Sequence, residues 1–373
     1  MKIKISFFIC VFAFAFFINL ISATNSEAEL CKTNVDGAII LSTNGVAGTQ
    51  PAGDVTKLPF NFKNNNAIAD QCNAEPDQYK ITFYKLALCT EDPYRQGGPV
   101  FDSCVDIMNN TSGKEIIIEK GIEYNNLLDG ADLILQTGTY PYLAAVVNNH
   151  LHVKHIQEFV QENGDPAKMW GNGDTSAADR RYCYTVGVVT TITGDHATDS
   201  DADTAYESAH GNVDVVTSGS GALARMKCTD NKATAEGNDA FATEIINHFG
   251  ANGDVDVDNW IPYLNVGDIG NGEVSSTDVE MAANMLEADN ETIATTFNTA
   301  KRIGVYIKYP NSVKISENTV GFKINIGTTH GISLDSAQVV EGGVVKTWMA
   351  KVGVDPFTIV VQTKTKRRRG AWR

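Results

Sequence analysis

Two acidic clusters are the residues of this chain whose spacing best suits metal chemistry. The first contains Asp199, Asp201, Asp203 and Glu207. Alternating carboxylates on a loop can direct several hard oxygen atoms at one cation at about 2.4 Å, which Ca²⁺ accepts. A second cluster, Asp254-x-Asp256-x-Asp258, repeats the spacing, but neither cluster has the glycine and glutamate positions of an EF-hand. The sequence therefore predicts calcium, if any, at the first cluster, and a solvated acidic loop is the alternative.

Three histidines form a second possible metal site. His150 and His152 share one face of a predicted strand, where two imidazoles can bind a single metal ion. Leu151 and Val153 alternate with them and supply a buried face, while His155 falls on that other face. This alternation favours an ordinary strand with two histidines towards solvent, so we do not expect zinc here.

The first 23 residues have the pattern of a secretory signal peptide. Lys2 and Lys4 precede an apolar run from Ile5 to Ile21, and Ala23 gives a small-residue exit. This pattern predicts cleavage after Ala23, although the run approaches the length of a transmembrane anchor. We expect a secreted protein, extracellular or at the cell surface, with no membrane span after cleavage.

An even number of cysteines is left once Cys10 leaves with the signal peptide. The six are Cys31, Cys72, Cys89, Cys104, Cys183 and Cys228. In an exported chain an even count predicts disulfide bonds, whose connectivity the sequence leaves open. Strand-like runs joined by a turn-rich segment favour Cys89–Cys104. Proximity along the chain favours Cys31–Cys72 and Cys183–Cys228.

The charge of the chain is uneven. The formal net charge is −15, and an acidic surface repels nucleic acid and anionic membranes, so neither is an expected partner. The basic residues of the last ten positions are Lys364, Lys366, Arg367, Arg368, Arg369 and Arg373. We expect this tail to bind an acidic face of a neighbouring subunit or another surface protein. A solvated terminus without a role and proteolytic trimming at the arginine run are the alternatives.

Stretches rich in β-branched and aromatic residues, separated by turn residues, occupy most of the chain. Tyr79–Leu88 and Arg181–Ile192 are examples. Helical spacing is found only in the C-terminal half, at Phe241, Ile245 and Phe249 and after the capping box Thr277-x-x-Glu280. The chain is therefore predicted to be mainly β, with antiparallel β-sandwich-like domains and two or three short helices in the C-terminal half.

Changes in composition suggest the order of domains. The predicted units are a signal peptide (1–23), a disulfide-stabilised β domain (24–192), an acidic, loop-rich connecting segment (193–237), a second β-rich domain with helices (238–363) and the basic tail (364–373).

Signatures of catalysis are missing from the sequence. It contains no Gly-x-Ser-x-Gly elbow, no His-Glu-x-x-His, no phosphate loop and no dinucleotide fingerprint. We therefore expect a non-enzymatic structural protein of a cell-surface or extracellular assembly, such as a surface-layer or filament subunit. Two alternatives stay open: a calcium-dependent adhesin whose aromatic side chains contact glycan, and a secreted hydrolase of unrecognised type. The aromatic candidates are Trp170, Trp260, Tyr263 and Trp348.

Overall fold

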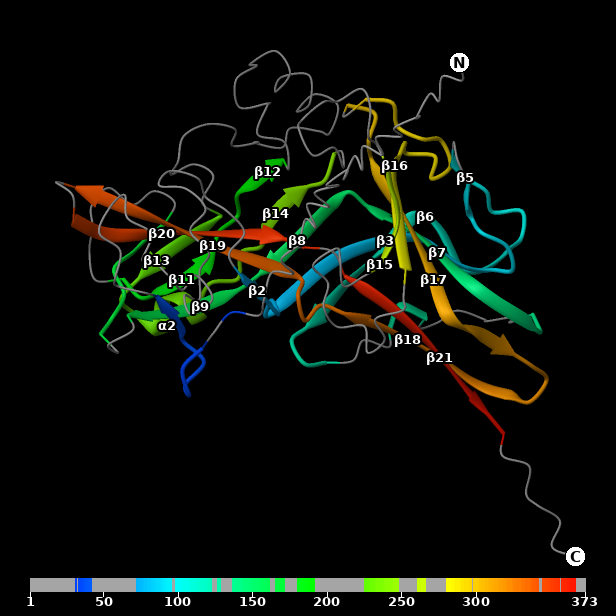
Figure 1. The fold of residues 1–373 in the computed structure, drawn as a ribbon, viewed down its shortest axis with the longest axis horizontal. Helices are drawn as coiled ribbons and strands as arrows, with labels where there is room; N and C mark the ends of the chain where they lie inside the picture. Colours follow the sequence, from blue (N-terminus) through cyan, green and yellow to red (C-terminus); the bar gives the residue numbers. More distant parts are fainter. Residues whose placement is uncertain are drawn as a thin grey trace, which may run out of the picture.

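The computed structural model gives the protein a mostly β fold, as the sequence predicts (Figure 1). The described residues are 31, 33–41, 72–95, 98–122, 126–128, 136–161, 165–171, 180–191, 225–247, 260–265, 280–296, 298–341, 344–355 and 357–366. Within these ranges the strands form several sheets, accompanied by one short helix, α2 (Lys232–Glu236), and one 3-10 turn, η2 (Asn126–Leu128).

A nine-stranded sheet forms the centre of the fold. In spatial order it contains β12 (Val189–Thr191), β14 (Ala242–Ile245), β8 (His150–Lys154), β3 (Gln78–Cys89), β7 (Gly138–Asn148), β17 (Arg302–Ile315), β16 (Glu280–Leu286) and β15 (Trp260–Asn265). The ninth strand, β6 (Cys104–Glu119), also pairs with β3. Strands from both sides of segment 193–237 therefore hydrogen-bond within one sheet. The predicted domain boundaries stay a prediction.

Two four-stranded sheets lie at the left of Figure 1. One contains β1 (Ile39–Leu41), β9 (Ile156–Gln161), β11 (Tyr182–Thr185) and β13 (Met226–Thr229); the other contains β10 (Met169–Trp170), β20 (Val344–Val354), β19 (Ile332–Glu341) and β2 (Cys72–Ala74). Two pairs complete the fold: β18 (Thr319–Gly327) with β21 (Thr358–Thr365), and β4 (Tyr94–Arg95) with β5 (Gly98–Pro99).

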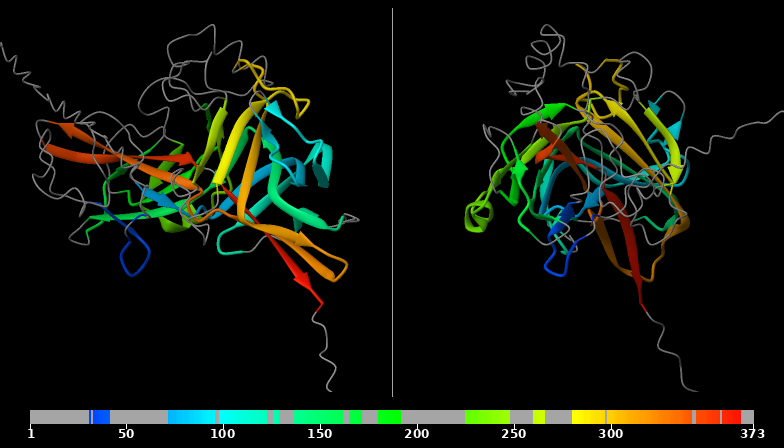
Figure 2. Two further views of the ribbon diagram at one scale, coloured as in Figure 1. Left: turned by 45° about the vertical axis from the view of Figure 1, so that its right-hand side comes forward. Right: turned by 60° about the vertical axis from the view of Figure 1, so that its left-hand side comes forward.

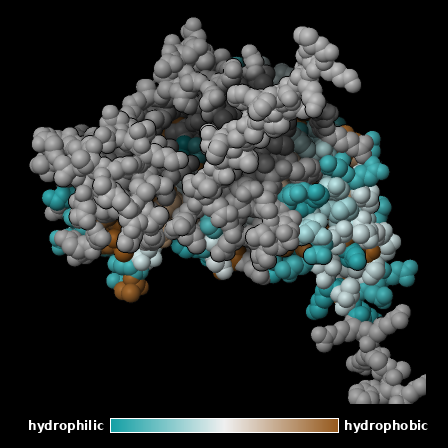
Figure 3. Space-filling view, viewed as in Figure 1, coloured by the Kyte–Doolittle hydropathy of each residue, from teal (hydrophilic) through white to brown (hydrophobic). Residues whose placement is uncertain are grey.

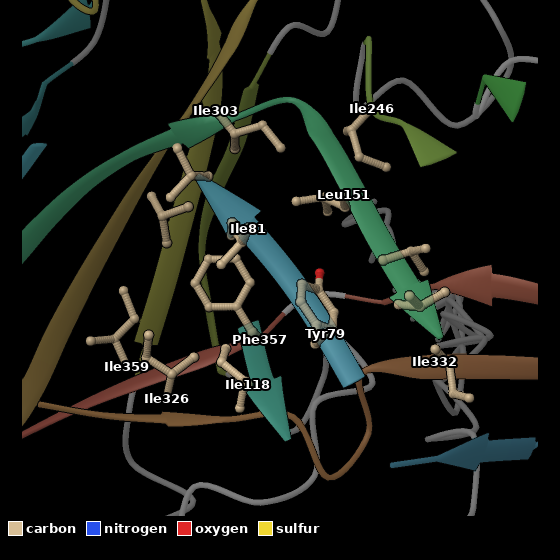
Figure 4. Close-up of a cluster of buried hydrophobic side chains, with 14 of the residues drawn as sticks. Tyr79, Ile81, Ile118, Leu151, Ile246, Ile303, Ile326, Ile332, Phe357 and Ile359 are labelled. Carbon is tan, nitrogen blue, oxygen red and sulfur yellow. The ribbon is translucent and has the colours of Figure 1, made fainter. Parts of the chain in front are cut away.

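The hydrophobic core joins strands that are distant in the sequence. Tyr79, Ile81 and Phe83 alternate along β3 and are fully buried on its inner face. The ring of Phe357, just before β21, meets Tyr79 and Phe83 edge to face, with centroids 6.0 and 5.9 Å apart. Figure 4 shows Tyr79 and Phe357 within this cluster, together with Ile326 and Ile359. Such aromatic contacts add to the free energy gained by burying the rings.

The prediction of C-terminal helices is wrong. Residues 242–245 form strand β14, and residues 280–286 form strand β16, which pairs with β17. Both strands are buried on both faces, so their apolar residues lack the alternation that marks a half-exposed strand. The described helix, α2, lies in the predicted connecting segment, where the Asn231 side chain accepts hydrogen bonds from two backbone N–H groups of its first turn.

Three disulfide bonds link segments of the sheets. They join the three cysteine pairs that the sequence favours. Cys89–Cys104 links directly opposite positions of β3 and β6, and Cys183–Cys228 does so for β11 and β13. Cys31–Cys72 ties the N-terminal segment to β2. Three intramolecular disulfides are consistent with an extracellular or secreted protein. In the part of the chain that the structure describes, helices long and apolar enough to cross a membrane are not found.

A buried ion pair holds three strands together. Arg225 and Glu244 are 3% and 7% exposed, and Arg225 Nη2 donates to Glu244 Oε1 at 2.7 Å. Arg225 Nη1 donates to the Val352 carbonyl oxygen, and Val354 N donates to Glu244 Oε2 at 2.6 Å. The pair therefore fixes the β20 backbone against β14 and the start of β13.

Candidate assembly surface

The β18–β21 pair is a two-stranded ribbon whose base is anchored in the core. Phe357 and Ile359 are 4% and 1% exposed, and Tyr309 Oη donates to the Ile359 carbonyl oxygen at 3.1 Å. Burial raises the pKa of Tyr309, so its hydroxyl group stays protonated and keeps donating this hydrogen bond. The start of β21 is therefore held against β17.

The two strands of the ribbon pair in a register that gives it two different faces. Ile324 and Ile326 lie opposite Val361 and Ile359 and turn towards the core. The intervening pairs include Lys323 with Gln362, on the other face. This alternation is visible in the sequence as one apolar residue at every second position of 320–326. It keeps the base of the ribbon folded against the body.

The outer half of the ribbon leaves the body. In Figures 1 and 2, β21 runs away from the sheets towards the C terminus. Val320 sits at a register shift between the Thr319–Thr365 and Gly321–Lys364 pairs, and Lys366 N donates to the Asn318 carbonyl oxygen at 2.8 Å. Strand-like pairing thus continues to the first residues of the basic tail.

Both ribbon strands have one edge without a described strand partner. Within the described ranges, β21 pairs only with β18, and β18 only with β21. An open edge presents backbone N–H and C=O groups that another strand can bond. In space-filling view the lower right of the molecule, where the ribbon lies, is largely hydrophilic (Figure 3). This polar surface is compatible with solvent and with a charged partner.

Two of the predicted tail residues lie at the end of this ribbon. Lys364 and Lys366 are exposed, and Val320, at the register shift next to the Gly321–Lys364 pair, is 59% exposed. We call Val320, Lys364 and Lys366 the basic ribbon end. The remaining tail residues, Arg367, Arg368, Arg369 and Arg373, lie outside the described residues. The sequence predicts strands at Ile303–Tyr309 and Val320–Ile326, but it did not single out Tyr309 or Val320 as functional residues.

The predicted calcium ligands also lie outside the described residues: Asp199, Asp201, Asp203 and Glu207, together with the cluster at 254–258. Across the described ranges, no group of three or more His, Cys, Asp and Glu side chains is placed to hold a metal ion. Calcium therefore stays a prediction. The aromatic candidates for glycan contact lie on three strands: Trp170 on β10, Trp260 and Tyr263 on β15, and Trp348 on β20, which pairs with β10.

The alternation along β8 is as predicted, although its two histidines are half-buried and do not simply face solvent. Leu151 and Val153 are buried, whereas His150 and His152 are half-buried on the other face of β8. His152 Nδ1 lies 2.7 Å from Thr243 Oγ1, and burial lowers the pKa of His152 to about 4. His155 is buried, with Nδ1 3.6 Å from Asp77 Oδ2. These contacts give the histidines a part in the packing of β8 against its neighbours.

The chain matches no protein-family model, no curated protein and no solved structure. The function proposed below therefore rests on the fold and on the β18–β21 ribbon.

Proposed function

We propose that the protein is a secreted, non-enzymatic structural subunit of a cell-surface or extracellular assembly. The observation that carries the proposal is the β18–β21 ribbon, which is anchored by Phe357 and Tyr309 and ends in exposed lysines. A strand edge supplies backbone hydrogen bonds to a partner, and the charges next to it select which partner binds. Secretion is supported by the three disulfides.

Charge distribution favours another copy of the same chain as the partner. The chain as a whole is acidic, with a formal net charge of −15, while its last ten residues are basic. Arginine and lysine contacts with carboxylates are individually weak when exposed, but several acting together bind measurably. Because these contacts are screened by salt, assembly is expected to weaken as ionic strength rises.

Electron microscopy of negatively stained, purified mature protein tests the proposal. We expect ordered polymers at low salt from the full chain and much reduced polymers after deletion of residues 364–373. The matched control is Lys232→Glu on exposed helix α2, which changes charge away from the ribbon and should leave polymers intact. A full chain that stays monomeric at every concentration and salt would overturn the proposal.

A further inference from the structure

The C-terminal end of β6 has a charge pattern opposite to that of the basic ribbon end. Glu115, Ile117 and Glu119 are exposed at alternate positions, whereas Ile116 and Ile118 are 2% exposed and belong to the core. Alternate residues of a strand point to the same face, so one apolar side chain lies between two carboxylates. We call Glu115, Ile117 and Glu119 the acidic strand end.

Both ends combine an exposed apolar side chain with flanking charge. The large apolar side chains that are exposed in the described ranges are Val35, Ile117, Ile122 and Val320. Ile117 is 40% exposed and Val320 is 59% exposed. An apolar contact with a charged rim is the usual composition of a protein interface. Glu115 and Glu119 flank Ile117 along β6, and Lys364 and Lys366 lie on the strand paired with the one that carries Val320, so the two ends carry opposite charge.

Like the ribbon strands, β6 has one edge without a described strand partner. Among the described strands, β6 pairs only with β3 along its 16 residues. Its carboxylates differ in how they are paired. Asp106 lies 2.9 Å from Lys85 Nζ, whereas the contact between Glu115 and Lys80 is 3.9 Å long. The Glu115–Glu119 end is therefore the part of β6 whose negative charge is more available to a partner.

We infer that the acidic strand end of one copy binds the basic ribbon end of the next copy, through strand pairing, ion pairs and an Ile117–Val320 contact. This inference rests on the proposed assembly function and names the surface that receives the ribbon. The two surfaces are different, so the contact is head to tail. Each added copy leaves one surface of each kind free, and such contacts propagate into a filament unless the geometry closes a ring.

Charge reversal on both surfaces tests the pairing. One variant is Glu115→Lys with Glu119→Lys, and the other is Lys364→Glu with Lys366→Glu. At low salt, each alone should raise the protein concentration of half-assembly by about tenfold or more, because like charges then face each other. All four substitutions in one chain should return that concentration to within about threefold of the wild-type value. Lys232→Glu is again the matched control.

Cysteine trapping gives a second readout. Chains with Ile117→Cys, mixed with chains carrying Val320→Cys, should form a disulfide-linked heterodimer under mild oxidation. Val35→Cys replaces Ile117→Cys in the control mixture, because Val35 is 100% exposed but lies on a turn near the N-terminal end of the described chain, not on β6. We expect the control to cross-link at least about tenfold less.

The outcomes separate this inference from the proposed function. Wild-type protein that never assembles refutes the proposed function, and the inference with it. Wild-type protein that assembles while both charge reversals assemble equally well refutes only the inference. A third outcome also contradicts the inference. In it, each charge-reversal variant loses assembly, the chain with all four substitutions does not regain it, and no Ile117–Val320 cross-link forms.

Discussion

His152 should make the fold sensitive to mild acid. Its ring is largely buried on β8, and burial, followed by the nearby charge of Lys80, lowers the pKa of His152 to about 4. An unfolded chain gives histidine a pKa of about 6.5. The folded state thus binds the proton more weakly than the unfolded state. The stability that depends on neutral His152 is therefore fully present above about pH 6.5 and is lost as the pH falls towards 4.

The size of the effect follows from the two pKa values. Between pH 7 and pH 5, the His152 imidazole alone should remove about 2 kcal/mol from the free energy of unfolding, and about 3 kcal/mol when the pH is well below 4. Burial also lowers the pKa of His155, while Asp77 opposes that shift, so His155 acts in the same direction. Between pH 7 and pH 5, the wild-type protein should consequently lose more unfolding free energy than His152 alone explains.

Urea unfolding at pH 7 and pH 5, followed by circular dichroism with the disulfides intact, measures this loss. The variant His152→Gln keeps a polar group near Thr243 but does not titrate, so its loss between the two pH values should be about 2 kcal/mol smaller than in wild type. Lys80→Gln should reduce the loss by less, because burial is the larger cause. If His152→Gln loses as much stability as wild type, the reasoning is wrong.

Three further predictions concern stability. Arg225→Met should lower the free energy of unfolding in urea by about 3–5 kcal/mol, because it leaves the Glu244 carboxylate buried without its cation. Adding Glu244→Gln should recover part of that loss. A double variant no more stable than Arg225→Met would contradict this prediction. Replacing Cys89 and Cys104 together by Ser should lower the free energy of unfolding by about 3 kcal/mol, and an unchanged unfolding midpoint would refute the estimate. Calcium at the 199–207 cluster should raise the melting temperature between chelator and millimolar calcium, and equal melting temperatures would exclude a structural site there.

Patterns local to a strand predicted much of the fold. The β-branched and aromatic residues of Tyr79–Leu88 and the turn-rich segment before Cys104 predicted strands joined by a disulfide, and the structure joins Cys89 and Cys104 across β3 and β6. Half-exposed strands reveal themselves because every second residue is apolar. The histidines of β8 followed the same rule, with Leu151 and Val153 buried between them.

Features that depend on contacts between distant segments were not predictable in this way. Glu280–Leu286 was predicted as helix because a strand covered on both faces loses its period-two pattern. Arg225 and Glu244 are separated by 19 residues, and the backbone groups that they bond lie on β20. Nothing in the local sequence marks them as a pair.

Sedimentation of the purified mature protein across a range of concentrations, at low and at high salt, tests the central claim most directly. The account predicts that the average mass rises with concentration at low salt without reaching a fixed oligomer, and that high salt or deletion of residues 364–373 returns the chain to monomer. A mass that stays at the monomer value under all these conditions would contradict it.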